Sequence, residues 1–153
     1  MDKNIKTETY LNDLLAKTYD AQRGYANAAE ATNQVQLKKW FVNQGIQRTQ
    51  FAAQLTQEIK NMNQEPEFDG TFLGDVHRGW MNLKSALSLN TDEAILEECI
   101  RGEKAAVDEY TNVLEHKSEL PPTVVTLLQN QQADVRTTVS KIKSLEDIAS
   151  HEG

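Results

Sequence analysis

The chain has 153 residues, of which 39% are hydrophobic and 25% are charged, a balance typical of one soluble domain with its own core. Its formal net charge of -7 argues against nucleic acid or an anionic membrane as a partner, because both require a basic surface. No apolar run approaches the ~20 residues needed to span a bilayer, and the polar start lacks the apolar core of a signal peptide, so we expect a cytoplasmic protein.

Two long helices are predicted in the first half of the chain, at residues 5–31 and 33–62. In both segments apolar residues recur at steps of three and four, which is the mark of one buried helical face. Asn33, followed by Gln36, resembles a capping box that opens the second helix. The joint between the two segments is short, so these helices should form an antiparallel hairpin.

The middle of the chain should leave the bundle. Residues 63–74 contain a proline, two glycines and several turn formers, and a short helix is predicted at 75–87. His77 and Arg78 lie near the start of that helix, where backbone amides could bind an anion, although such a pair is more often solvated. Trp80 should seal an end of the bundle, whereas an exposed Trp80 would indicate a partner surface.

The second half predicts another helical pair, at residues 91–117 and 122–149. Asn90 and Glu93 are spaced for a capping box, and Leu120-Pro121-Pro122 ends the first helix and places Pro122 in the first turn of the second. A hairpin, a long crossover and a second hairpin make an all-α bundle with the connectivity of ferritin-like proteins.

Each long helix interrupts its apolar stripe with polar side chains. Glu103 occupies a position where a bundle expects Leu or Val, and a buried carboxylate must be paired, hydrogen-bonded or bound to metal. Arg48 could donate to Glu103 and to nearby amide oxygens. Alternatively, Arg48 extends to solvent and Glu103 is only half buried. The predicted polar layer consists of Gln22, Tyr25, Arg48, Glu103, Tyr110 and Gln132.

A dimetal site of the carboxylate type needs about four carboxylates and two imidazoles in the core. The sequence has no Glu-x-x-His, so we expect no metal and no cofactor. The alternative is an atypical di-iron or manganese site in which Glu103 is joined by Asp20, Glu98 or Asp134. Cys99 fits a buried small apolar residue better than a redox thiol.

Four segments, at residues 11–14, 24–30, 77–84 and 101–105, resemble an uncharacterised bacterial family of ferritin-like four-helix-bundle proteins. The similarity extends from about residue 4 to residue 148. The resemblance implies four long helices with a helical crossover and a bacterial stress or envelope-maintenance context, but no established reaction. It also implies a glutamate where this chain has Gln22, so the metal layer looks degenerate.

Three functions are compatible with this sequence. We favour a non-enzymatic structural or interaction protein of unknown biochemical role, in which polar contacts replace the metal layer. The alternatives are a metal-binding oxidoreductase or iron-handling protein, and a small-molecule binder that uses the polar layer for recognition. A homodimer is compatible with all three, because helical bundles commonly pair through an apolar strip.

Overall fold

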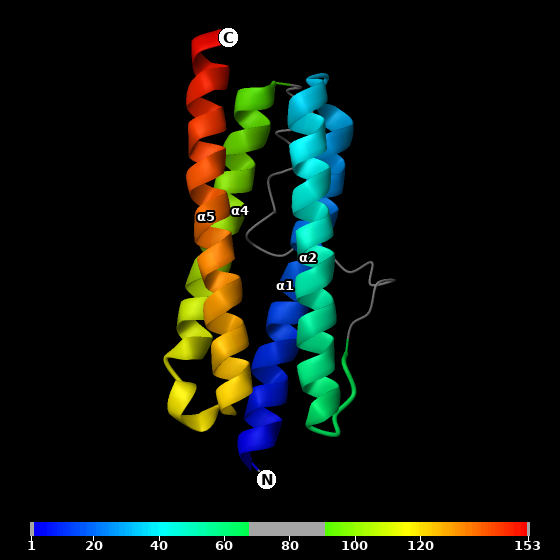
Figure 1. Ribbon diagram of the computed structural model, residues 1–153, viewed down its shortest axis with the longest axis vertical. Helices are drawn as coiled ribbons and strands as arrows, with labels where there is room; N and C mark the ends of the chain where they lie inside the picture. The colour runs from blue at the N-terminus through cyan, green and yellow to red at the C-terminus, as the bar shows by residue number, and fades with distance from the viewer. Residues whose placement is uncertain (1, 68–90, 153) are drawn as a thin grey trace.

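The computed structural model describes residues 2–67 and 91–152, with side chains for residues 7–67 and 91–145. The long helices contain 30, 27, 23 and 31 residues, more than two thirds of the chain, and the described ranges contain no strand. The predicted all-α four-helix bundle is therefore confirmed (Figure 1). The elements are α1 (Asp2–Ala31), α2 (Val35–Asn61), α4 (Asp92–Leu114), the 3-10 helix η2 (Lys117–Glu119) and α5 (Pro122–Glu152).

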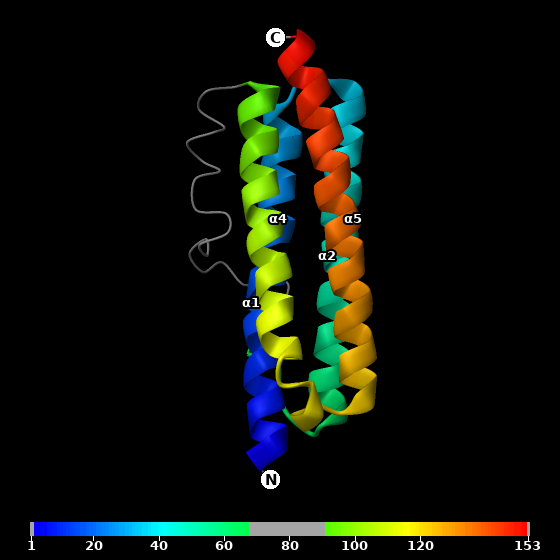
Figure 2. The same ribbon diagram turned by 90° about the vertical axis from the view of Figure 1, so that its left-hand side faces the viewer.

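The helices form two hairpins, α1 with α2 and α4 with α5, that lie side by side (Figures 1 and 2). Helices α2 and α4 both begin at the end of the bundle where the C-terminus lies and both finish at the end where the N-terminus lies (Figure 1). They are therefore parallel, while α1 and α5 run the opposite way. The predicted short helix at 75–87 lies outside the described residues. No described helix has a stretch that is long and apolar enough to cross a membrane.

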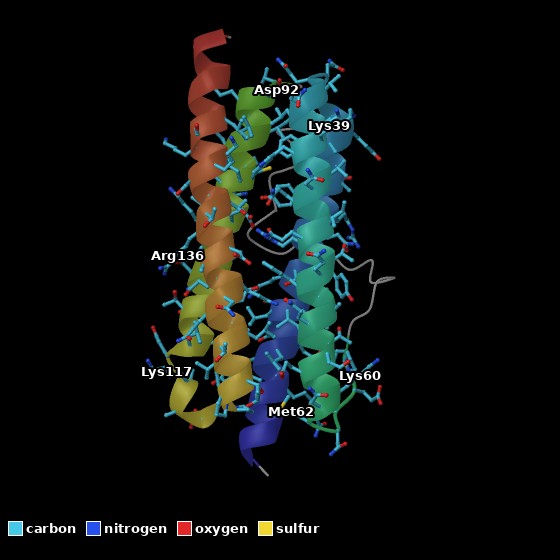
Figure 3. All side chains as sticks on the ribbon, in the orientation of Figure 1. Lys39, Lys60, Met62, Asp92, Lys117 and Arg136 are labelled. Atoms are coloured by element: carbon cyan, nitrogen blue, oxygen red, sulfur yellow. The ribbon has the colours of Figure 1, made fainter. Side chains whose placement is uncertain are left out.

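The turn between α1 and α2 is closed by Thr32 rather than by the predicted capping box. The N-cap of α2 is Gln34, whose side chain makes no capping bond, so the box from Asn33 was wrong. The Thr32 hydroxyl accepts a hydrogen bond from the Gln34 backbone N–H at 3.2 Å and donates one to Asp92 at 2.7 Å. Asp92 lies at the same end of the bundle as this turn (Figure 3), so Thr32 joins the two hairpins.

Several other helix boundaries differ from the prediction, among them the end of α5 at Glu152, three residues later than predicted. The N-cap of α4 is Thr91, not Asn90, and its hydroxyl accepts from the Ala94 backbone N–H at 3.3 Å. Helix α4 ends at Leu114 instead of residue 117, because its last turn tightens into η2. Helix α1 begins at Asp2, three residues earlier than predicted. Pro122 opens α5 as predicted.

The core consists of two apolar clusters stacked along the bundle. One cluster contains Phe51 and Tyr110 and the other contains Phe41 and Cys99. Along α2, the buried residue between these clusters is Arg48; along α4, the buried Gly102 and Glu103 lie between them. The two apolar parts of the core are therefore separated by a buried charged level.

Candidate functional site

The charged level is built around an ion pair between α2 and α4. The Arg48 guanidinium donates through Nη2 to Oε2 of Glu103, and these residues are 2% and 0% exposed. Each residue lies near the middle of its helix, so the pair crosses the bundle at mid-height. The sequence predicted this contact because both residues interrupt an apolar stripe.

Tyr25 of α1 is the third residue of this cluster. Its hydroxyl donates to the same oxygen, Oε2 of Glu103, at 2.8 Å, and the residue is 0% exposed. A second guanidinium nitrogen, Nη1 of Arg48, donates to Oε1 of Gln47 at 2.6 Å. The guanidinium carbon lies 5.1 Å from the centre of the Phe51 ring, within cation–π range. Two helices, α1 and α2, therefore supply the side chains that hold one carboxylate oxygen of α4.

Burial and charge act in opposite directions on this cluster. Burial raises the pKa of the Glu103 carboxyl, while attraction to Arg48 and the hydrogen bond from Tyr25 lower it, and the net direction is upward. Burial is the largest single influence on the pKa of Arg48 and lowers it, but the charge and hydrogen bond of Glu103 together with Tyr25 and Tyr110 raise it by more, so the net direction is upward. Glu103 Oε1 accepts no hydrogen bond from the described residues. The ion pair is therefore held together at Oε2 of Glu103, while the other oxygen of this carboxylate lacks a hydrogen-bond partner among the described residues.

A second polar cluster lies nearer the N-terminal end of the bundle than the ion pair, and it contains a residue that was not predicted to belong to the buried polar layer. Gln131 of α5 is 1% exposed and accepts from the Tyr110 hydroxyl at 2.7 Å. Its amide nitrogen donates to Oε1 of Gln54 at 2.9 Å and to the Phe51 carbonyl at 3.4 Å. Tyr110 was predicted to join the layer, and it does so through Gln131 rather than through Glu103.

Two predicted members of the layer lie elsewhere. Gln22 is half-buried and donates to the Thr49 hydroxyl at 2.5 Å, so it does not reach Glu103. Gln132 is also half-buried and donates to the Val107 carbonyl and the Thr111 hydroxyl, at 3.1 Å and 2.8 Å. Both predictions were wrong for one reason: each residue lies one position beyond the buried face, which passes through Ala21 and Gln131.

The remaining candidates have separate outcomes. His77, Arg78 and Trp80, the crossover candidates, lie outside the described residues. Cys99 is buried, and burial together with the charge of Glu103 raises the pKa of its thiol well above the ordinary value. A buried thiol that stays protonated is a packing group rather than a nucleophile.

A domain of unknown function (DUF2383) matches residues 6–116, well over half of the chain. The chain belongs to this family. Tyr25, Arg48, Glu103 and Tyr110 all lie within the DUF2383 match, whereas Gln131, on α5, lies after it. The ion-pair cluster is thus built entirely within the family domain. No curated protein matches the chain.

The geometry of the DUF2383 bundle limits what the cluster can do. In the part of the chain that the structure describes, no three His, Cys, Asp or Glu side chains come together to hold a metal ion. The cavity beside Arg48 has a volume of about 20 Å³, room for about one water molecule. Larger clefts of about 190 and 380 Å³ lie between α2 and α5, and they are lined mainly by Gln, Asn and Thr side chains.

The buried tyrosines of this domain should resist ionisation at alkaline pH. Burial, and then the charge of Glu103, raise the pKa of Tyr25, and burial likewise raises the pKa of Tyr110. The folded state therefore holds these protons more tightly than the unfolded state, so stability should fall as pH rises above about 10, the ordinary tyrosine value. We expect their phenolate absorbance to appear together with the loss of helix.

Tyr25→Phe provides the control for this titration. It should reduce the phenolate signal that appears on unfolding and leave the earlier part of the titration unchanged. If Tyr25→Phe instead reduced only the signal that forms while the helix content is intact, Tyr25 would be accessible to solvent and its placement on Glu103 would be wrong.

Proposed function

We propose that the protein is a non-enzymatic bundle on a ferritin-like scaffold, in which the Arg48–Glu103 ion pair takes the place of a metal at mid-height. The observation that carries this proposal is the direct contact between the guanidinium and the Glu103 carboxylate in the core. On this proposal the protein acts through its shape and surfaces, as a structural or interaction protein.

The chemistry of the donor set supports this proposal. Oε2 of Glu103 accepts hydrogen bonds from Arg48 and from Tyr25, so this oxygen already has its partners. The Arg48 guanidinium keeps its charge at any physiological pH. A metal cation at this level would have to approach a fixed positive charge. Arg48 thus supplies the positive charge that a metal would supply elsewhere, without redox or Lewis-acid chemistry.

The access to the cluster supports a non-catalytic role. A general acid or base must come within hydrogen-bond reach of its substrate. Glu103 and Tyr25 are 0% exposed, and the adjoining cavity of about 20 Å³ is far smaller than the ~300 Å³ of a typical ligand pocket. Catalysis at this carboxylate would require the helices to separate.

The direction of the helices supports the ferritin-like part of the proposal. Parallel α2 and α4 require a connection that returns along the bundle, as in ferritin-like folds, and a plain up-and-down bundle would make them antiparallel (Figure 1). The resemblance also implied a bacterial, stress-related context, and the sequence a cytoplasmic protein. We retain both as parts of the proposal, and they can be tested by following protein level and location after oxidative or osmotic challenge.

Metal analysis tests the proposed function. Protein purified without a chelator should retain no stoichiometric iron or manganese after the metal has been added back and the excess removed. EDTA should leave the melting temperature unchanged, because the core holds itself together without metal. Retention of about two metal ions per chain at neutral pH, as in dimetal bundles, would overturn the proposal.

A further inference from the structure

Helix α2 carries a second heptad pattern on the side that faces away from the core. Val35, Val42 and Ile46 are 64%, 47% and 52% exposed, and they are the large exposed hydrophobic side chains of the described residues. Steps of seven and four place them in one narrow sector of the helix. We call this the α2 stripe. Its other positions, at the same alternating steps of four and three, are the exposed residues Lys39, Thr49 and Ala53.

The α2 stripe lies in the longest segment of the chain without an acidic residue. The sequence contains 23 Asp and Glu residues, yet none falls between Glu30 and Glu58. Two copies of a chain with a net charge of -7 repel each other across most of their surfaces. They can approach through the outer face of α2 without opposing negative charges.

We propose that two copies of the chain pair through their α2 stripes, with the helices antiparallel about a two-fold axis. A two-fold contact requires a surface that is complementary to itself, and in an antiparallel pair each stripe residue faces a fixed partner. One register sets Ile46 against the partner's Val42, and Val35 against the partner's Ala53.

The same register also keeps the one charged residue of the α2 stripe away from its own copy in the partner. Lys39, which lies on the part of α2 nearer the C-terminal end of the bundle (Figure 3), then faces the partner's Thr49. No lysine meets a lysine and no lysine is left against an apolar side chain at the centre of the contact. The Val42 and Ile46 side chains of the two copies lie around the axis, and Val35 of each copy lies toward an end of the contact.

The size of the stripe indicates a weak dimer. Stable interfaces commonly bury about 800 Å² on each partner, with aromatic anchors, whereas this stripe offers three aliphatic side chains per copy. Dimerisation should therefore depend on protein concentration over the micromolar range, and it should persist in high salt because it does not rely on ion pairs.

Sedimentation velocity of the full chain over a wide concentration range tests the pairing. The wild type should shift from monomer to dimer as concentration rises. Ile46→Glu, which puts a carboxylate against the partner's Val42, should raise the dissociation constant more than about tenfold. Ala133→Glu, on the exposed surface of α5, adds the same charge away from the stripe and should leave the dissociation constant unchanged.

A compensating variant tests the register. Val42→Lys alone should also weaken the dimer, whereas Val42→Lys combined with Ile46→Glu should recover at least tenfold relative to Ile46→Glu, because each Glu then faces a Lys of the partner. Circular dichroism of each variant establishes that the bundle is folded. A wild type that remains monomeric at all concentrations, or a dimer that Ile46→Glu does not weaken, would overturn the proposal.

Discussion

Glu103→Ala should lower the free energy of unfolding by about 3–5 kcal/mol, the cost of removing one partner of a buried ion pair. The substitution leaves the Arg48 guanidinium in the core with no carboxylate, and arginine cannot escape the penalty by losing a proton. It also removes the acceptor of the Tyr25 hydroxyl. Urea unfolding at neutral pH measures this loss.

A matched control separates the ion pair from ordinary loss of packing. Glu98 lies in the first third of the same helix and pairs with Arg101 at the surface, where one salt bridge contributes at most about 1 kcal/mol. Glu98→Ala should therefore have a small effect. If Glu103→Ala cost as little as Glu98→Ala, the Glu103 side chain would be solvated and the buried level would not exist.

Arg48→Met should destabilise the protein in a manner that depends on pH, unlike the Glu103 substitution. The remaining Glu103 carboxyl loses its cation, so its pKa, already raised by burial, rises further. An acid with a raised pKa in the folded state contributes most stability below its unfolded pKa, about 4.3, and that contribution is lost as pH rises. If Glu103 must be protonated in the folded Arg48→Met protein, this lowers the free energy of unfolding by up to about 3.7 kcal/mol at pH 7 and about 1 kcal/mol at pH 5.

Unfolding free energies of wild type and Arg48→Met at pH 5, 6 and 7 measure this effect. The difference between the two proteins should grow by up to about 2.7 kcal/mol over this range. Arg48→Met in a Glu103→Leu background is the control, since no carboxyl remains there to take up a proton. A difference that stays constant with pH in the single variant would mean that Glu103 does not sense Arg48.

The fold was predictable because the apolar stripes are long and regular. Leu11, Leu14 and Leu15 on α1, and Val124 and Leu128 on α5, are buried as their spacing indicates. The helix ends were less predictable, because several polar residues in each turn can act as caps. The first turn is closed by Thr32 instead of Asn33, through a tertiary contact with Asp92 that the local sequence does not contain. Helix α4 is capped by Thr91 through a local bond to Ala94, where Asn90 was predicted.

The polar cluster was only partly predictable, and the errors share a cause. The buried face of α5 follows alternating steps of four and three: Val124, Leu128, Gln131, Val135, Thr138 and Ile142. A step of four from Leu128 leads to Gln132 instead. On α1 the same error replaces Ala21 with Gln22. A strict heptad period, which is typical of helices that pack at small angles, would have identified Gln131.

Glu103 and Arg48 were identified for a different reason. On each helix, a step of three from one buried neighbour and a step of four from the next buried neighbour lead to the same position. Either spacing therefore places Arg48 and Glu103 in the core. Their contact could be inferred because a buried charge needs a partner of opposite sign. Tyr25 was placed near the layer, but its bond to Oε2 of Glu103 depends on how α1 packs against α4 and required the structure.

The paired variant Arg48→Met with Glu103→Leu tests the ion-pair account most directly, because it removes both charges and refills the space with apolar atoms. We predict that its unfolding free energy at neutral pH returns to within about 1 kcal/mol of the wild type, well above that of Glu103→Ala, since a packed apolar pair avoids the cost of desolvating two ions. A double variant as unstable as Glu103→Ala would contradict the account, because it would show that Glu103 has a role in the core that does not depend on Arg48.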